Sequence, residues 1–126
     1  ILFEGTNTGY GITIYSILSD DRQSVTYSFS VFNPKDKQFK KIIGREVAIE
    51  HFLEGKRKEI SLTNLSPFMF SAKTIMFLIL WDILSTVQEE NQKNPDAKRS
   101  RRFIRDLRDQ VFQSFMSLEI FSRESL

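Results

Sequence analysis

Cysteine is absent from this chain of 126 residues, and histidine occurs once. The lack of cysteine excludes disulfides, thiolate metal sites and cysteine nucleophiles. The single histidine, His51, has Glu50 and Glu54 near it in sequence, but a metal or acid–base site needs more partners than this, and exposure on a helix explains the residue equally well. Gly9-Tyr10-Gly11 is too short for a phosphate-binding loop and leads into a strand pattern. We therefore expect no enzyme activity, no cofactor and no metal.

Long apolar runs are also missing. The most apolar stretch, residues 68–84, is interrupted by Lys73 and Asp82 and is shorter than the roughly 20 residues that a bilayer-spanning helix needs. Residues 1–5 lack the basic region and apolar core of a signal peptide. Hydrophobic residues make up 40% of the chain and charged residues 27%, which is typical of a globular protein. We expect one domain spanning residues 1–126, located in the cytoplasm and not bound to a membrane.

Positive charge is concentrated in two segments, although the net charge is only +2. Residues 98–108 contain six basic residues and one acidic residue, and residues 35–58 contain eight basic and four acidic residues. The remainder of the chain is acidic overall. This distribution favours an anionic partner.

The first half of the sequence predicts a β-hairpin and a short helix. Residues 10–18 and 25–32 alternate between apolar and other side chains, as strands with one buried face do, and Asp20-Asp21 lies between them as a turn. A further short strand is predicted over residues 60–65. The helix is predicted over residues 39–53, with Gly55 as its C-terminal cap. The apolar side of this helix is expected to comprise Phe39, Ile42, Ile43, Val47 and Phe52.

The second half predicts two long helices. Ser66-Pro67 is a favourable helix start, and this helix should continue to about Glu90. Residues 75–81 are apolar without a break, so this segment must be covered on every side, by the sheet, the last helix or another subunit. The last helix is predicted over residues 97–122, capped by Asp96. Its apolar stripe comprises Phe103, Leu107, Val111, Phe115 and Leu118.

Together these elements predict an α+β fold. An N-terminal antiparallel β-sheet with a short helix (residues 1–65) is expected to pack around two long C-terminal antiparallel α-helices (residues 66–126). The apolar central helix also favours assembly into a homo-oligomer, a dimer or larger.

Arg101, Arg105 and Arg108 recur at a spacing that places them on one face of the last helix. In the structural interpretation this face is solvated, with Arg102 paired to Asp106 and Arg105 paired to Asp109, four residues apart in each case. That interpretation leaves Arg101 and Arg108 without partners. In the alternative the arginines bind phosphate, for which the planar guanidinium is well suited.

Aromatic and other basic residues add candidates for the same anion. Phe77 and Trp81 lie one helical turn apart, and they are either core residues or a stacking surface for a base. Asn91 either caps that helix or contacts a base edge. Lys56-Arg57-Lys58 forms a second basic cluster. Lys40, Lys41 and Arg45, near the start of the first helix, are either surface charges or an anion site.

Residues 32–48 contain a strand end, a Pro34-Lys35-Asp36 turn and the pattern K-x-x-G-R-x-x-A from Lys41 to Ala48. Followed by two long helices, this layout resembles the phage anti-Thoeris family of signal sponges. The resemblance implies a sheet wrapped around two C-terminal helices, oligomeric assembly, and sequestration of cyclic ADP-ribose isomers without their destruction. The cytoplasm expected above for this protein would then be that of the host cell. The matching site residues here are Arg57, Phe77 or Trp81, Asn91 and Arg108, and Arg105 joins them as a candidate from the arginine row. Some relatives also bind cyclic oligonucleotides at a separate site, for which Lys41 and Arg45 are the candidates here.

Two other functions fit the sequence. One is single-stranded nucleic-acid binding, in a fold resembling Whirly or transcriptional-coactivator proteins, with Tyr15, Tyr27, Phe29 and the basic turn at residues 35–41 lining a groove. Such binding should weaken steeply with salt, unlike binding in a two-phosphate pocket. The other is inhibition of a host enzyme through surface contact.

Overall fold

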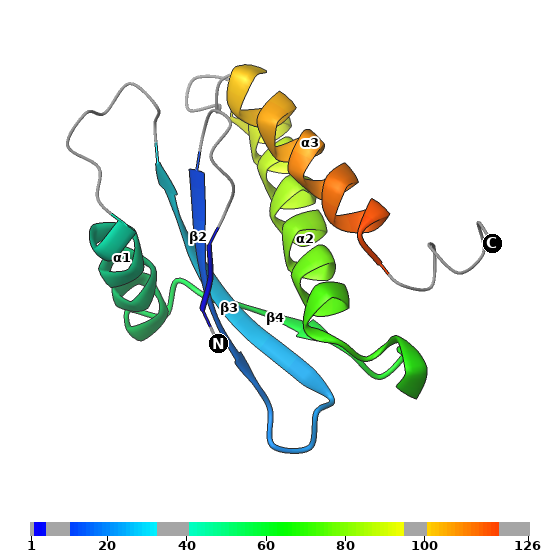
Figure 1. Cartoon of the computed structure of the whole chain (residues 1–126). Helices are drawn as coiled ribbons and strands as arrows, with labels where there is room; N and C mark the ends of the chain where they lie inside the picture. Colours follow the sequence, from blue (N-terminus) through cyan, green and yellow to red (C-terminus); the bar gives the residue numbers. More distant parts are fainter. Residues whose placement is uncertain (1, 5–10, 33–40, 95–100, 119–126) are drawn as a thin grey trace. The chain divides into compact units, whose positions relative to one another are not determined.

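A computed structural model describes residues 2–4, 11–32, 41–94 and 101–118 (Figure 1). The chain divides into two compact units, Ile1–Leu65 and Ser66–Leu126. The first unit contains an antiparallel sheet and a helix, and the second contains two long helices. The predicted α+β class is confirmed, and the assignment of the whole chain to one domain stays a prediction.

The described strands of the first unit form one antiparallel sheet in the order β1-β2-β3-β4. The predicted hairpin corresponds to β2 (Gly11–Leu18) and β3 (Ser24–Phe32). β4 (Lys58–Ser61) begins two residues earlier than predicted, and β1 (Leu2–Glu4) was not predicted because it is only three residues long. In the turn between β2 and β3, Asp21 Oδ1 accepts hydrogen bonds from Ser19 Oγ at 2.7 Å and from the Gln23 amide at 3.0 Å.

The two faces of β3 separate its apolar and polar residues as the alternation predicts. Ser28 lies opposite Tyr15 on β2, and Tyr27 lies opposite Ser16. The expectation of only one buried face is wrong, because Ser28 and Tyr27 are each 1% exposed. Helix α1 (Lys41–Leu53) covers the polar face. The Ser28 hydroxyl on this face donates a hydrogen bond to the Ala48 carbonyl of α1.

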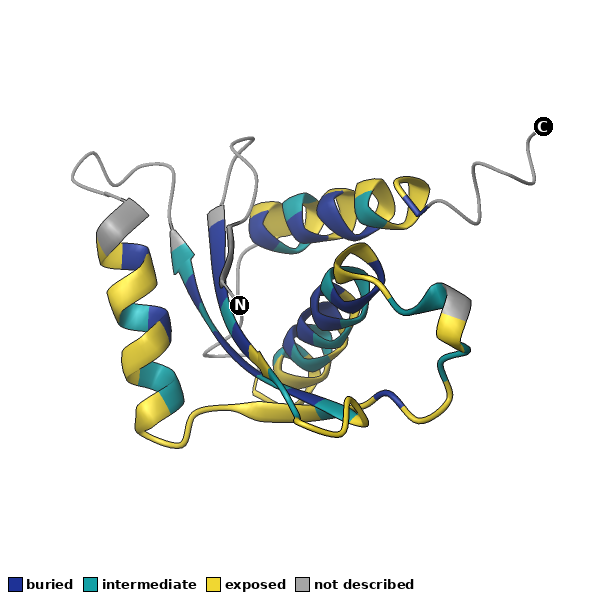
Figure 2. Cartoon of the chain, turned by 60° about the horizontal axis from the view of Figure 1, so that its bottom comes forward, coloured by how far each residue is buried: buried dark blue, intermediate teal, exposed yellow. Residues whose placement is uncertain are grey.

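Helix α1 packs on the sheet through small residues and through Phe52, whose ring centroid lies 5.0 Å from that of Tyr15 on β2, so the predicted apolar side is correct only in part. Ser30 Oγ donates to the Gly44 carbonyl at 2.9 Å, one turn before Ala48, and both helix residues are buried. Ile43, predicted to face inward, is 44% exposed, and Phe39 lies outside the described residues. Figure 2 shows exposed residues along the side of α1 that faces away from the sheet. His51 Nδ1 donates to the Phe29 carbonyl at 3.0 Å, which gives this histidine a structural role.

The end of α1 has the predicted glycine cap. Gly55 has a φ of 85°, a left-handed conformation that glycine adopts without a side-chain clash. The Lys56 amide donates to the His51 carbonyl at 2.9 Å and the Gly55 amide to the Phe52 carbonyl at 3.2 Å. These two bonds form a Schellman motif, which satisfies the last carbonyls of the helix.

The second unit consists of α2 (Ala72–Lys93) and α3 (Arg101–Met116), which lie side by side (Figure 1). Ser66-Pro67 does not start α2 as predicted but begins a short 3₁₀ turn, η1 (Pro67–Met69). The N-cap of α2 is Ser71, whose Oγ accepts a hydrogen bond from the Thr74 amide at 3.2 Å. The expected cap of α3, Asp96, and residues 97–100 and 119–122 lie outside the described residues.

Candidate functional site

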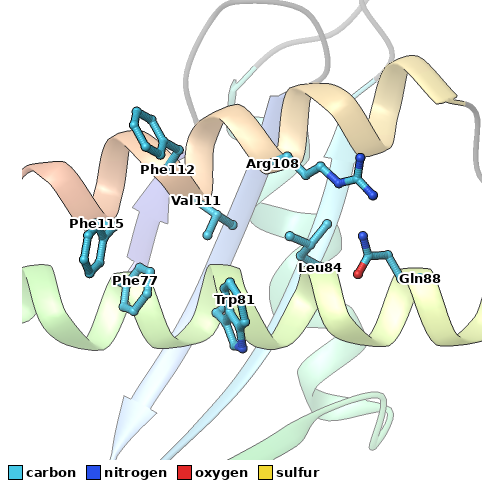
Figure 3. Close-up of a pocket in the computed structure, with 8 residues that line it drawn as sticks. All are labelled: Phe77, Trp81, Leu84, Gln88, Arg108, Val111, Phe112 and Phe115. Carbon is cyan, nitrogen blue, oxygen red and sulfur yellow. The ribbon is translucent and has the colours of Figure 1, made fainter.

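A cavity of about 620 Å³ lies between α2 and α3, entirely within the second unit (Figure 3). A volume of this size is typical of small-molecule sites. Six of the lining residues are apolar and two are polar. They are Phe77, Trp81, Leu84 and Gln88 of α2, and Arg108, Val111, Phe112 and Phe115 of α3.

The spacing of the lining residues explains how two helices form this cavity. On α2 they recur after four, three and four residues, so they follow one face of the helix. The two helices run in opposite directions, so Phe77 lies beside Phe115 at one end, and Gln88 lies across from Arg108 at the other (Figure 3). The cavity therefore has an aromatic end and a polar end.

The aromatic end is a chain of three rings. The Phe77 centroid lies 6.3 Å from that of Trp81 and 5.6 Å from that of Phe115, within the range of favourable aromatic pairs. Trp81 is 55% exposed, so the interpretation of Trp81 as a core residue is wrong. Phe77 is held between two rings, whereas Trp81 offers ring surface to a ligand.

The polar end combines a guanidinium and a carboxamide. Arg108 extends from α3 towards the Gln88 carboxamide on α2 (Figure 3). Within the described part of the chain, neither side chain has a hydrogen bond or an ion pair. The neighbouring carboxylate on α2, Glu89, binds Lys93 Nζ at 2.9 Å, which raises the pKa of Lys93. Both polar groups at this end can therefore bind a ligand without first breaking a described hydrogen bond.

The other arginines of α3 lie outside the cavity lining. Asp106 lies between Arg102 and Arg105, with N–O distances of 3.9 Å to the Nε of each. The predicted pair of Arg102 with Asp106 is confirmed. The predicted pair of Arg105 with Asp109 is wrong for the described residues, because Arg105 is paired with Asp106 instead. Of the predicted arginine row, only Arg108 reaches the cavity.

The remaining predicted site residues are placed elsewhere. Asn91 is three residues beyond Gln88 on α2 and does not line the cavity. Arg57 belongs to the first unit, where it donates to the Phe52 carbonyl at 2.8 Å and lies 5.2 Å from the centre of the Phe52 ring. Arg45 is exposed on α1, and Lys41 is the first residue of that helix, with its side chain outside the description.

Five lining residues were not predicted as site residues: Leu84, Gln88, Val111, Phe112 and Phe115. The signal for Gln88 was its position four residues after Leu84, where it continues the face that begins with Phe77 and Trp81. Phe112 lies next to Val111, outside the predicted apolar stripe, and is 64% exposed. The sequence signal for Phe112 was an aromatic residue directly beside the apolar stripe but not part of it.

Among the described residues, no cluster of His, Asp and Glu is arranged to hold a metal ion. No helix in the described part of the chain has the length and hydrophobicity to cross a membrane. Comparison with known proteins gives no match: no family model, no curated protein and no solved structure is significantly similar to this chain.

Proposed function

We propose that this protein is a phage-encoded, non-catalytic binder that sequesters a small cyclic nucleotide signal, a cyclic ADP-ribose isomer, and so blocks antiphage defence in the host cytoplasm. The observation that supports it is that the Trp81 ring and the Arg108 guanidinium line one cavity. A nucleotide needs both a flat surface for its base and a cation for its phosphate.

The expected contacts can be compared with the affinity that sequestration requires. Stacking of one base contributes about 1–3 kcal/mol, and a hydrogen bond to a charged group contributes about 1.5–3 kcal/mol. Nanomolar binding corresponds to about 12 kcal/mol. The remaining binding free energy must come from burial of the ligand against the apolar walls. A homo-oligomer that covers the exposed Trp81 and Phe112 would increase this burial.

The nucleic-acid alternative loses its predicted groove. Tyr15 lies on the same face of the sheet as its cross-strand partner Ser28. Because Ser28 and Tyr27 are adjacent on β3, they point to opposite faces, so Tyr15 and Tyr27 also lie on opposite faces. Tyr27 is also buried, and Tyr15 packs edge-on against Phe52 with centroids 5.0 Å apart. These aromatic residues therefore cannot stack along one strand of nucleic acid, and the interpretation that they line one groove is wrong.

The test is to incubate the purified protein with cyclic ADP-ribose isomers, cyclic oligonucleotides and oligo-dT, to remove unbound ligand, and to identify what denaturation releases. We expect release of an intact cyclic ADP-ribose isomer. Release of a cleaved product would contradict sequestration. Retention of oligo-dT alone would favour nucleic-acid binding, and a stable complex with a host enzyme in place of any nucleotide would favour the protein inhibitor.

A matched pair of variants connects binding to the cavity. Arg108→Ala removes the lining guanidinium, whereas Arg105→Ala removes one that is paired with Asp106 outside the cavity. Calorimetry should show a loss of about 10- to 150-fold in affinity for Arg108→Ala, the equivalent of 1.5–3 kcal/mol. Arg105→Ala should change affinity much less. Equal effects of the two variants would show that the cavity is not the site.

A further inference from the structure

We infer that Gln88 sets the charge selectivity of the cavity: its uncharged carboxamide leaves Arg108 available to an anionic group and donates a second hydrogen bond to that same group. This inference rests on the proposed function, because it assigns the polar end of the cavity to the phosphate of the ligand.

The geometry places two groups of donors across one opening. Gln88 comes from α2 and Arg108 from α3, and their polar ends face each other (Figure 3). A carboxamide has two N–H donors and a guanidinium has five. Since neither group has a hydrogen-bond partner in the described part of the chain, a phosphate oxygen between them could accept from both.

The absence of charge at position 88 is the decisive property. Glutamate has nearly the same shape as glutamine, but a carboxylate facing Arg108 would form an ion pair with it. The cation would then be neutralised, and the second group would repel an anion instead of donating to it. Replacing Gln88 by glutamate would therefore convert an anion-binding end of the cavity into an ion pair with Arg108.

The position of Gln88 also sets the shape of the ligand. Gln88 lies seven positions after Trp81, so the stacking surface and the polar end lie about 10 Å apart along the α2 axis. A ligand that uses both must have a flat ring at one end and an anionic group at the other, joined by a spacer. This is the chemistry of a nucleotide, and neither a free base nor inorganic phosphate spans that distance.

The first test needs no ligand. In Gln88→Glu, we expect NMR titration to give the introduced carboxyl a pKa below the ordinary value of about 4.3 for glutamate, because the Arg108 guanidinium stabilises the charged form. In the double variant Q88E/R108A the pKa should return to the ordinary value. An unshifted pKa in the single variant would overturn the inference, because the two groups would then not face each other.

The second test measures cyclic ADP-ribose binding by calorimetry. Gln88→Glu should weaken binding at least tenfold, and Gln88→Leu, which removes the hydrogen bond without adding charge, should weaken it only several-fold. Gln92→Glu, an exposed site one turn further along α2, controls for the added charge and should bind normally. Equal affinities of Gln88→Glu and the wild type, or equal losses for Glu and Leu, would overturn the inference. If the wild type binds no nucleotide, the proposed function is overturned. The pKa of the carboxyl introduced at position 88 still shows, independently of any ligand, whether residue 88 and Arg108 face each other.

Discussion

The rings of Phe77 and Phe115 lie with their centroids 5.6 Å apart and their planes inclined by 50°. This contact joins α2 to α3 at the aromatic end of the cavity, and it uses Phe77 surface that a ligand would otherwise contact. Trp81 touches Phe77 but is 55% exposed. We therefore expect the two neighbouring aromatic residues to have different roles, with Phe77 in packing and Trp81 in ligand contact.

Substitution of each ring by alanine should separate these roles. Trp81→Ala should reduce nucleotide affinity by the equivalent of about 1–3 kcal/mol while costing less stability than the roughly 3–5 kcal/mol of a buried aromatic residue. Phe77→Ala should cost more stability than Trp81→Ala, because its ring packs against two others. Urea denaturation and calorimetry on both variants measure the two effects. A larger loss of stability in Trp81→Ala would contradict this assignment.

The hydroxyl of Ser28 should stabilise the first unit. It is buried and donates to the Ala48 carbonyl of α1, so Ser28→Ala should lower the free energy of unfolding by about 0.5–1.5 kcal/mol. Thr63→Ala, in an exposed position, serves as the control and should change stability by less than about 0.5 kcal/mol. If both variants unfold at the same urea concentration, the hydrogen bond from β3 to α1 contributes nothing.

Gly55 should not tolerate a side chain, for a reason of backbone conformation alone. Its φ is 85°, and a Cβ added there meets no atom within 4 Å outside Gly55 and its two chain neighbours. Gly55→Ala should therefore cost about 1–2 kcal/mol through the left-handed conformation, in which Cβ crowds the adjacent backbone, with no contribution from overlap with the rest of the protein. Gly55→Asn should cost less, because asparagine tolerates this region better. Thermal or urea unfolding of both variants is the measurement, and equal stabilities for Gly55→Ala and the wild type would contradict it.

The turn between β2 and β3 should respond to acid through Asp21. The Ser19 hydroxyl, followed by the Gln23 amide, lowers the pKa of Asp21 from its ordinary 3.8. Because the folded pKa lies below the unfolded one, the contribution to stability is complete above about 3.8 and is lost as the pH falls through the folded value. NMR titration should show a depressed pKa that rises towards 3.8 in Ser19→Ala. An unchanged pKa in that variant would show that the hydroxyl is not the cause.

The sequence predicted those elements whose local pattern and packing agree. The alternation in β2 and β3 and the left-handed cap at Gly55 are set by neighbouring residues, so they were found correctly. The start of α2 was placed at Ser66 because Ser-Pro is a favourable local signal, but Ser71 provides the cap through a hydrogen bond to the Thr74 amide. Two serines with similar local patterns cannot be distinguished without that geometry.

Packing between elements accounts for the other errors. The alternation in β3 predicts that its serines face solvent, but Ser28 and Ser30 are buried under α1. The small residues Gly44 and Ala48 bring α1 close enough for their carbonyls to accept hydrogen bonds from these serines. In the candidate site, Phe77, Trp81 and Arg108 could be selected by residue type and period. For Gln88 and Phe112 the sequence gives only the weaker signals of spacing and position, because their importance comes from what lies opposite them on the other helix.

The four residues that α3 contributes to the cavity span only two turns, from Arg108 to Phe115. A slip of α3 by one residue would rotate it by about 100°, removing the guanidinium from one end and a ring from the other in the same movement. Such a slip would thus remove both ends of the site together. Affinity in this protein should accordingly be adjustable by exchanging side chains on the two helices, and not by sliding one along the other.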